Sequence, residues 1–327
     1  MKNQTCKFIL FLISIGFISI FSSCTSTNKN ENKIPVIAFI DYVEDATLAQ
    51  ARAGFYQALN EAGYNEDSGT IKIIYRNAQG DPTVLLQSVD YIISQHPTFI
   101  ASNTTLATIS TVQRTNEIPI FMMVAPRPDL AGLTSKEGKA PINLYGVYET
   151  LDYIDTSATL IKKLFPQSKK VGCIYSAAES QSLDALERLK ISCSKMNIEL
   201  IATPVNNSSE TQLITQSVLA KNIDVFFALP DNVIFSSFET VVKACNDKNI
   251  PIITSEAGLV SRGALASFGA DMYQWGYQSG KQAAQYLKSN SLNGLNAELV
   301  RLRTKVINKE AARKFSIVAD STFVVSR

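Results

Sequence analysis

The stretch PVIAFIDYVEDATLAQARAGFYQALNEAG, residues 35–63, contains two different hydrophobic patterns in succession. It begins with the apolar run Pro35 to Ile40, which is typical of a buried strand. The residues that follow at helical spacing, all on one apolar face, are Leu48, Ala51, Phe55, Leu59 and Ala62. Gly63 then stands where a left-handed helix cap favours glycine. The stretch therefore predicts a strand followed by an amphipathic helix.

The same alternation continues through the first half of the chain. Further strands are predicted at 70–75, 98–102 and 118–124, and helices at 84–94 and 105–114. Strands that alternate with helices indicate right-handed crossovers and a parallel sheet with helices on both faces. The predicted fold class is therefore α/β, with a doubly wound parallel sheet.

The second half repeats the first. Strands are predicted at 170–175, 198–203, 224–229 and 250–254, with helices at 151–165, 182–195, 210–221 and up to Asp247. The tripeptide Ile118-Pro119-Ile120 recurs as Ile250-Pro251-Ile252. We therefore expect two lobes of similar design, at 34–147 and 148–270, with a seam near 146–150. Residues 271–327 are expected to form a closing helix and a segment that crosses the hinge.

The N-terminus carries an export pattern. Lys2 and Lys7 precede an uncharged apolar run, 8–21, which is too short for a comfortable membrane span of about 20 residues. Ser22-Ser23-Cys24 resembles the lipobox of bacterial lipoproteins, whose cysteine is acylated. We expect a signal peptide at 1–23, a lipid on Cys24 and a flexible tether at 24–33. The alternative is an ordinary cleaved signal with a chance cysteine.

Composition excludes several functions. The formal charge is only +2, and no basic cluster is interleaved with aromatic residues, which argues against nucleic-acid binding. Cys173, Cys193 and Cys245 have no CxxC spacing and are expected to be buried, so neither a disulfide framework nor a zinc site is supported. The single histidine, His96, is expected in a loop. We expect no metal, no cofactor and no enzyme activity.

Polar loops follow the predicted strands. Open parallel sheets bind ligands beyond the carboxyl ends of their strands, so two such lobes predict a cleft between them. The loops expected to face it are 41–46, 102–105, 125–129, 176–182, 230–232 and 255–258.

Several stretches, in this order, resemble one family. KKVGCIYSAAESQS (169–182) and GALASFGADMYQWGYQSGKQAAQYL (263–287) are similar to segments of periplasmic-binding-protein-like lipoproteins of ABC importers, in the group of tryptophan- and tyrosine-binding proteins. The resemblance runs from Ile34 to about Val318. It implies a type I periplasmic-binding-protein fold, an amino acid-like and possibly aromatic ligand, and an ABC permease as partner. Arg127-Pro128 and Ser176-Ala177 depart from the family's Asp-Pro and Asn-Pro.

An amino acid-like ligand would need partners for its carboxylate and its ammonium. A carboxylate suits a helix N-terminus, and residues 102–105 precede a predicted helix. The candidates there are Ser102, Asn103, Thr104 and Thr105, with Ser182 on the other lobe, unless they are ordinary N-caps. Asp231 is the first choice for the ammonium, because a family-like binding position falls there, but a helix cap is an equal alternative. Glu256 and Asp41 are weaker candidates, and Asp271 is expected to cap the long helix.

Two further side chains are candidates for the cleft. Tyr42 is the best placed of the aromatic residues near the loops, which also include Tyr175, Phe268 and Tyr273. Arg127 either clamps an anion in bidentate fashion or pairs with Asp129.

The sequence therefore predicts an extracytoplasmic, lipid-anchored protein that captures a small solute by hinge closure and delivers it to an ABC importer. Two rivals remain. One is a tethered sensor of the same fold that signals to a membrane receptor, and the other is an enzyme derived from the fold, which the missing catalytic motifs argue against.

Overall fold

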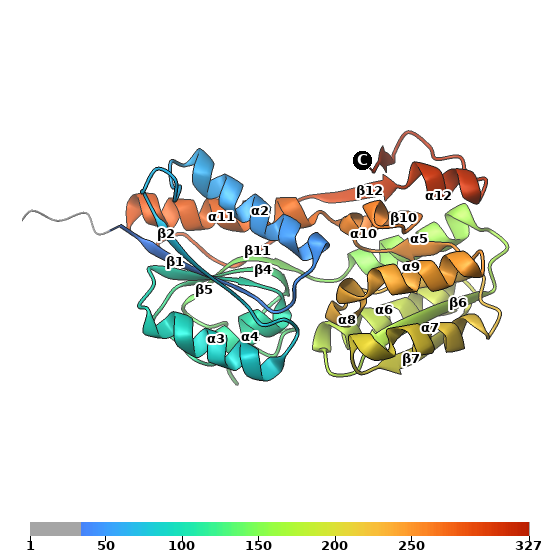
Figure 1. Cartoon of the computed structure of the whole chain (residues 1–327), viewed down its shortest axis with the longest axis horizontal. Coiled ribbons are helices and arrows are strands. Elements are labelled where there is room, and N and C mark those ends of the chain that lie inside the picture. The colour runs from blue at the N-terminus through green and yellow to red at the C-terminus, as the bar shows by residue number, and fades with distance from the viewer. Residues whose placement is uncertain (1–33, 327) are drawn as a thin grey trace, which may run out of the picture. The chain divides into compact units, whose positions relative to one another are not determined.

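The computed structural model describes residues 34–326, of which Pro35 onward form one compact unit. It contains two sheets with helices on both faces (Figure 1). The predicted signal peptide, Cys24 and the tether lie outside the described residues. The α/β class with two doubly wound, mainly parallel sheets is confirmed. No helix in the described part is long and apolar enough to cross a membrane.

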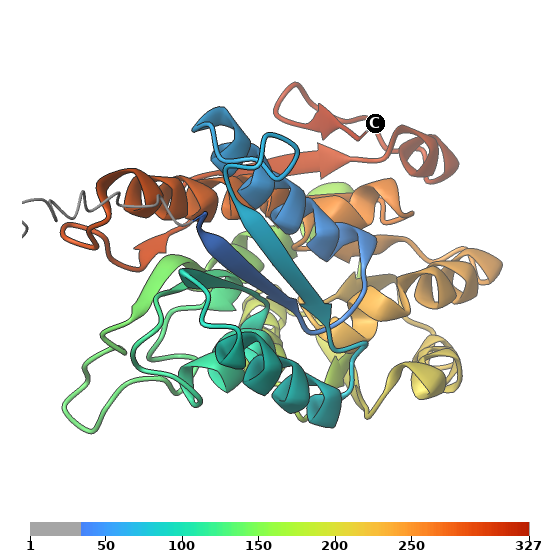
Figure 2. The same cartoon turned by 60° about the vertical axis from the view of Figure 1, so that its left-hand side comes forward.

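The first sheet is parallel throughout, in the order β11-β5-β4-β3-β1-β2. Its strands are β1 (Val36–Asp41), β2 (Lys72–Asn77), β3 (Phe99–Asn103), β4 (Ile120–Pro126), β5 (Leu144–Glu149) and β11 (Glu298–Leu299). The helices around it are α2 (Ala46–Glu61), α3 (Pro82–Ser94), α4 (Thr105–Val112) and α11 (Met272–Ser289). Helices α2 and α11 cover one face and α3 and α4 the other, as Figures 1 and 2 both show. We call this sheet with its helices the first lobe.

The second sheet has the order β13-β12-β10-β9-β8-β6-β7, and only the β10–β12 pair is antiparallel. Its strands are β6 (Lys170–Ser176), β7 (Glu199–Val205), β8 (Val225–Ala228), β9 (Ile252–Thr254), β10 (Ala266–Ala270), β12 (Arg303–Ile307) and β13 (Val324–Val325). Its helices are α5 (Tyr153–Leu164), α6 (Ser180–Lys195), η1 (Ser208–Glu210), α7 (Thr211–Leu219), α8 (Asn232–Ser236), α9 (Phe238–Asp247), α10 (Ala257–Ser261) and α12 (Lys309–Lys314). We call this sheet with its helices the second lobe.

The chain passes between the lobes three times. It leaves the first sheet after β5, returns from β10 to α11, and leaves again between β11 and β12. The glycine-spaced helix α11 therefore belongs to the first lobe, although it follows the second lobe in sequence. These three short passages are the covalent connections about which the lobes can move.

Glycines let α2 and α11 approach closely. A Cβ on Gly276 would lie 1.8 Å from the Ala51 carbonyl oxygen, and one on Gly54 would lie 2.0 Å from that of Tyr273. Only glycine permits backbones to pack at this separation. The close packing fixes α11, and with it the first residues of that helix, against the first lobe.

Buried apolar runs account for the strands. A row of edge-to-face aromatic pairs crosses the first lobe, with ring centroids 5.7 Å apart for Phe39–Phe55, 6.2 Å for Phe55–Phe99 and 5.1 Å for Phe99–Phe121. Such pairs stabilise a core beyond the area that they bury. Cys173, Cys193 and Cys245 are buried free thiols, as predicted.

Candidate functional site

A cavity lies between the lobes, at the carboxyl ends of both sheets. Its empty volume is about 400 Å³, part of which is open to solvent. We call it the inner cavity. The first lobe contributes residues from the β3–α4 junction, β4 and α11, and the second contributes residues from α6, α8 and the start of α10. Both lobes therefore contact whatever occupies it.

The wall of the inner cavity is mainly apolar and aromatic. Tyr153 and Phe235 come from the second lobe, and Met272 and Trp275 from the first turn of α11. The Trp275 indole N–H donates to the Val147 carbonyl at 2.8 Å, which fixes the ring. This wall suits the apolar part of a small solute.

Helix α4 begins at the inner cavity without a side-chain cap. Its N-cap, Thr104, makes no capping hydrogen bond. The Thr104 hydroxyl is buried without a hydrogen-bond partner among the described residues. The first backbone bond of the helix runs from Thr108 N–H to the Thr104 carbonyl, so the preceding N–H groups have no partner within the helix. An uncapped N-terminus with a free hydroxyl favours an anionic group.

Backbone strain is concentrated around the same cavity. Thr104, Val124 and Leu151 all line it and have φ of 88°, 52° and 63°. The other described non-glycine residues with positive φ are Asn, Gln, His or Ser, which tolerate this region better. Strain of this kind clusters at functional sites, where it holds groups in position.

On the second-lobe side of the inner cavity, two buried oxygen acceptors have no partner among the described residues. They are Oε1 of Gln181 and Oε2 of Glu256. The other Glu256 oxygen accepts from the hydroxyls of Tyr153 at 2.7 Å and Ser255 at 3.1 Å. Burial raises the pKa of Glu256 to about 7, although these two hydrogen bonds oppose the rise. The two free acceptors suit a cationic donor.

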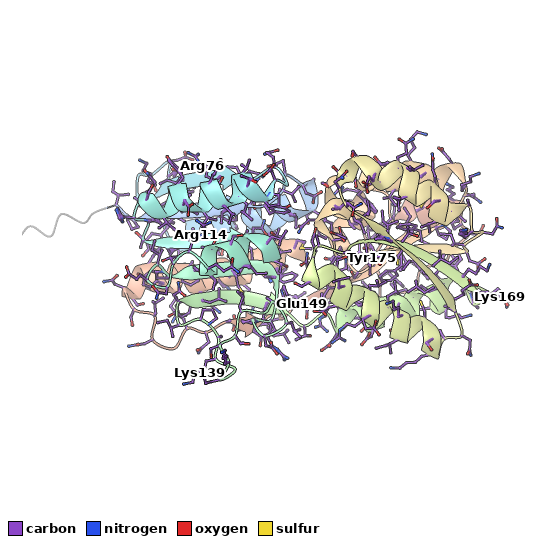
Figure 3. The ribbon with its side chains drawn as sticks, turned by 90° about the horizontal axis from the view of Figure 1, so that it is seen from below. Arg76, Arg114, Lys139, Glu149, Lys169 and Tyr175 are labelled. Atoms are coloured by element: carbon purple, nitrogen blue, oxygen red, sulfur yellow. The ribbon has the colours of Figure 1, made fainter. Side chains whose placement is uncertain are left out.

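Glu149 lies where the chain first leaves the first lobe (Figure 3). It is fully buried and accepts hydrogen bonds from the Arg303 guanidinium at 2.5 and 3.1 Å. Since Arg303 stands on β12, this ion pair joins two of the three passages between the lobes. Glu149 lines the inner cavity, but its charge is already balanced.

A second and wider cavity lies between the lobes, with an empty volume of about 1280 Å³ that includes space open to solvent. We call it the outer cavity. Asn232 lines both cavities, so they are neighbours. Tyr42 stands on its first-lobe side, where its hydroxyl donates to the Gly80 carbonyl at 2.7 Å. Glu179 stands on its second-lobe side and is only 3% exposed.

Four of the predicted residues line a cavity. Thr104, Thr105 and Glu256 line the inner cavity, and Tyr42 lines the outer one.

Three predicted residues of the first lobe lie behind the inner cavity. Asp41 is buried and pairs with Arg52, and it also accepts from the amide of Asn103 at 2.7 Å. Burial raises the pKa of Asp41, and Arg52 opposes the rise. Ser102 shares a 2.9 Å hydrogen bond with Thr108. These side chains therefore support the β3–α4 junction.

The structure places Asp231 as a helix cap, the alternative weighed from the sequence. Its carboxylate accepts from the N–H groups of Val233 and Ile234, from Ser176 N–H and from the Ser182 hydroxyl, at 2.6 to 3.2 Å. With four partners inside the protein, Asp231 lines neither cavity. Ser182 is its partner, so both lie in the supporting layer.

Arg127 lies on the surface. Its guanidinium donates to both oxygens of Asp129 at 2.6 and 2.9 Å, and both side chains are about half exposed. The structure therefore shows the Asp129 pairing that was the alternative to an anion clamp. Asp271 accepts from Gln274 N–H as the cap of α11, as predicted.

Sequence reasoning missed several residues of the site. Glu179, Gln181 and Asn232 stand in loops that were expected to face the cleft, so their position was available as a signal. Tyr153 and Trp275 reach the inner cavity from the start of α5 and from α11, which no local pattern indicates.

Comparison with known proteins identifies the family. Residues 33–326 match the family model described as ABC transporter substrate binding protein. A tyrosine-binding protein of Clostridioides difficile is 33% identical over 319 residues, which cover 94% of this chain and 92% of that protein.

Two solved structures extend the comparison. An ABC domain of Streptococcus pneumoniae in complex with L-Trp has a TM-score of 0.79 at 25% identity, covering 88% of this chain and 96% of that one. The ligand-free, open structure of a substrate-binding protein with adhesive properties from Clostridium difficile has a TM-score of 0.65 at 26% identity, covering 90% of this chain and all of that one.

These findings agree with the predicted type I periplasmic-binding-protein fold and the predicted recognition. Proteins of this family are extracytoplasmic solute-binding components of ABC transporters and not enzymes, in agreement with the expectation from the sequence. The chain belongs to the family of ABC transporter substrate-binding proteins.

Proposed function

We propose that this protein captures an amino acid-type solute in the inner cavity and delivers it to an ABC permease. The observation that carries the proposal is that one cavity has hydrogen-bond donors on one side and acceptors on the other. An uncapped helix N-terminus faces it from the first lobe, and two unpartnered acceptors face it from the second. A zwitterion satisfies both at once.

The carboxylate of the solute binds at the N-terminus of α4. The hydroxyl of Thr104 and the unbonded N–H groups of the first turn donate to it, and Thr105 adds a second hydroxyl. The first lobe is therefore the lobe that binds the carboxylate, in agreement with the helix-terminus argument from the sequence.

The ammonium of the solute binds between Gln181 Oε1 and Glu256 Oε2. A buried carboxylate without a cation is costly, and Glu256 has no ion-pair partner within the described part of the chain. A cationic ligand group removes that cost. Glu256 therefore takes the role for which Asp231 was the first choice.

The apolar part of the solute contacts the wall formed by Tyr153, Phe235 and Trp275. The named ligands of the two relatives, tyrosine and L-Trp, are amino acids with aromatic side chains. An aromatic amino acid is accordingly the class that we expect first.

Capture requires the lobes to close. At nearly equal sequence identity, this structure is more similar to the L-Trp complex than to the ligand-free, open structure, with TM-scores of 0.79 and 0.65. This difference supports a closed arrangement of the lobes here. The ligand acts by favouring the closed arrangement over the open one, about the three passages between the lobes.

Export and anchoring complete the proposal. The pattern at 1–24 supports a signal peptide followed by a lipid on Cys24, and 24–33 would tether the binding unit to a bacterial membrane. Labelling cells with a radioactive fatty acid tests it. Wild-type protein should incorporate the label and Cys24→Ala should not, whereas equal labelling would contradict the anchor.

The solute itself is tested by thermal unfolding against a panel of amino acids, nucleosides, sugars and carboxylates. The chain is first unfolded and refolded to remove any ligand that copurifies. A specific ligand at about 100 times its Kd stabilises the fold by about 2.7 kcal/mol. We expect hits among the amino acids only, and hits confined to the other classes would contradict the proposal.

Delivery is tested separately, by uptake into vesicles that contain a candidate ABC permease of the same bacterium. Transport that depends on this protein supports an importer component. If ligand binds but no transport follows, the tethered sensor replaces the importer as the better account.

A further inference from the structure

Three buried acids near the cleft, Asp41, Asp45 and Glu149, each pair with an arginine, namely Arg52, Arg262 and Arg303. The buried carboxylate of Asp231 has no arginine partner but accepts four hydrogen bonds inside the protein. Glu179 and Glu256 are at most 3% exposed and have no ion-pair partner in the described part of the chain. Both stand on the second lobe, one in each cavity.

The two unpaired carboxyl groups have the same local arrangement. Oε1 of Glu256 accepts hydrogen bonds from Tyr153 and Ser255, and Oε2 has no partner. Oε2 of Glu179 accepts from the side-chain amide of Gln181. It also accepts from the side-chain amide of Asn232 at 2.8 Å and from the Asn232 backbone N–H at 3.3 Å. No hydrogen bond from a described residue reaches the other oxygen, Oε1 of Glu179. In each case the protein fixes one oxygen and leaves the other available at a cavity.

We propose that Glu179 forms a second cation subsite, in the outer cavity, and that the protein accepts amino acids bearing a second ammonium group that extends there. This proposal rests on the proposed function, because it assumes that the head group of the amino acid occupies the inner cavity. It names a broader ligand class than aromatic amino acids alone.

The geometry connects the two subsites. Gln181 donates to Glu179 while its own carbonyl oxygen faces the inner cavity, and Asn232 lines both cavities. The two carboxyl groups are therefore linked through a single layer of amide side chains. A ligand with ammonium groups at both ends would pass beside Asn232, which borders both cavities, and bring one ammonium to each carboxyl group.

No lysine or arginine of the described residues forms an ion pair with Glu179. Asp231 lies close enough to add negative potential, and Tyr42 faces it from the first lobe, with Asp81 beyond Tyr42. Burial, followed by the charge of Asp231, raises the pKa of Glu179. The empty subsite therefore favours the protonated carboxyl group. An ammonium that binds there releases one proton from Glu179 to the solvent.

Matched ligands test the second subsite. Lysine and norleucine have the same head group and differ at the side-chain end, where only lysine has an ammonium. 4-(Aminomethyl)phenylalanine and 4-methylphenylalanine form an aromatic pair with the same difference. We expect the diamino member of at least one pair to bind about tenfold more tightly, and Glu179→Gln to abolish that preference while single-amine probes keep their affinity.

Calorimetry of the wild-type protein gives a second readout that needs no variant. Titrations at pH 7 in buffers of different ionisation enthalpy measure the protons released on binding. The diamino member should release up to about one proton more than its partner.

The possible outcomes test the second subsite and the proposed function separately. If single-amine amino acids bind and neither diamino probe gains affinity or releases additional protons, the second subsite is wrong and the proposed function stands. If the preference survives in folded Glu179→Gln protein, Glu179 is not its cause. If no probe of either kind binds, the proposed function fails, and the second subsite fails with it.

Discussion

An ion pair between the lobes should set how tightly the protein holds its ligand. Arg262 ends α10 in the second lobe, and its guanidinium donates to Oδ2 of Asp45 at 2.5 Å and to the Thr47 hydroxyl at 3.0 Å. Asp45 caps α2 in the first lobe. The side chains are 13% and 2% exposed, so water screens the pair weakly. Opening of the lobes must separate these groups.

The substitution Asp45→Asn removes the charge and retains the cap. The Oδ1 atom of Asp45 accepts from the N–H groups of Thr47 and Leu48, and an asparagine can do the same. A hydrogen bond to a charged group contributes about 1.5 to 3 kcal/mol. Because Arg262 keeps Glu239 as a partner, the loss should lie near the lower end of that range. This corresponds to a ligand affinity about tenfold weaker.

Stopped-flow fluorescence and calorimetry measure the effect. We expect the weaker affinity to appear mainly as faster dissociation, since the ion pair holds the closed arrangement. Glu239→Gln is the matched control, because it removes the partner of Arg262 within the same lobe. It should change the Kd by less than about twofold, as for an exposed ion pair. An unchanged Kd in folded Asp45→Asn protein would refute the reasoning.

Three further predictions concern the fold and the inner cavity. Gly276→Ala should lower the free energy of unfolding by about 1 to 3 kcal/mol in urea titrations, because its Cβ meets the Ala51 carbonyl; a variant as stable as wild type would contradict the close packing. Thr104→Val keeps the side-chain shape but removes the unpartnered hydroxyl. The binding free energy measured by calorimetry should weaken by about 1 to 2 kcal/mol, with little change in melting temperature. An unchanged affinity would show that Thr104 does not contact the ligand. The ammonium of the ligand stabilises ionised Glu256, whose pKa without ligand is about 7. Ligand affinity should therefore fall as the pH drops below about 7, by up to about tenfold per pH unit, and Glu256→Gln should flatten that profile. The same pH dependence in the variant would show that another group takes up the proton.

The fold was predictable because parallel strands buried on both faces read as continuous apolar runs. The segment VIAFID of β1 and the segment VFFA of β8 are examples, and both are almost entirely buried. One predicted helix, ending at Asp247, is interrupted in the structure. Ser237 leaves the helical region there, with φ of −131°, and separates α8 from α9. The apolar spacing on either side does not show that break.

The site was only partly predictable, and the reason differs between residues. Thr104 and Glu256 line the inner cavity, as expected from the convergence of the carboxyl ends of parallel strands. Asp231 caps α8 instead of lining it, and the sequence could not separate the two alternatives, since an aspartate that caps a helix and one that binds a ligand occupy the same place after a strand. Trp275 was missed because α11 joins the first lobe through packing against α2 and through contacts with β4 and β5, all of them far from α11 in sequence.

We propose that one cavity recognises both charged ends of an amino acid. Calorimetry with tyrosine, tyramine and 3-(4-hydroxyphenyl)propionate separates the two ends, because tyramine lacks the carboxylate and the propionate lacks the ammonium. We predict that tyrosine binds at a single site; if the unfolding panel finds another amino acid, that amino acid is tested with its own two analogues. Each analogue should lose about 1.5 to 3 kcal/mol or more, as expected for a missing charged hydrogen-bonding group. Analogues that bind as tightly as the amino acid would contradict recognition by the α4 N-terminus and Glu256.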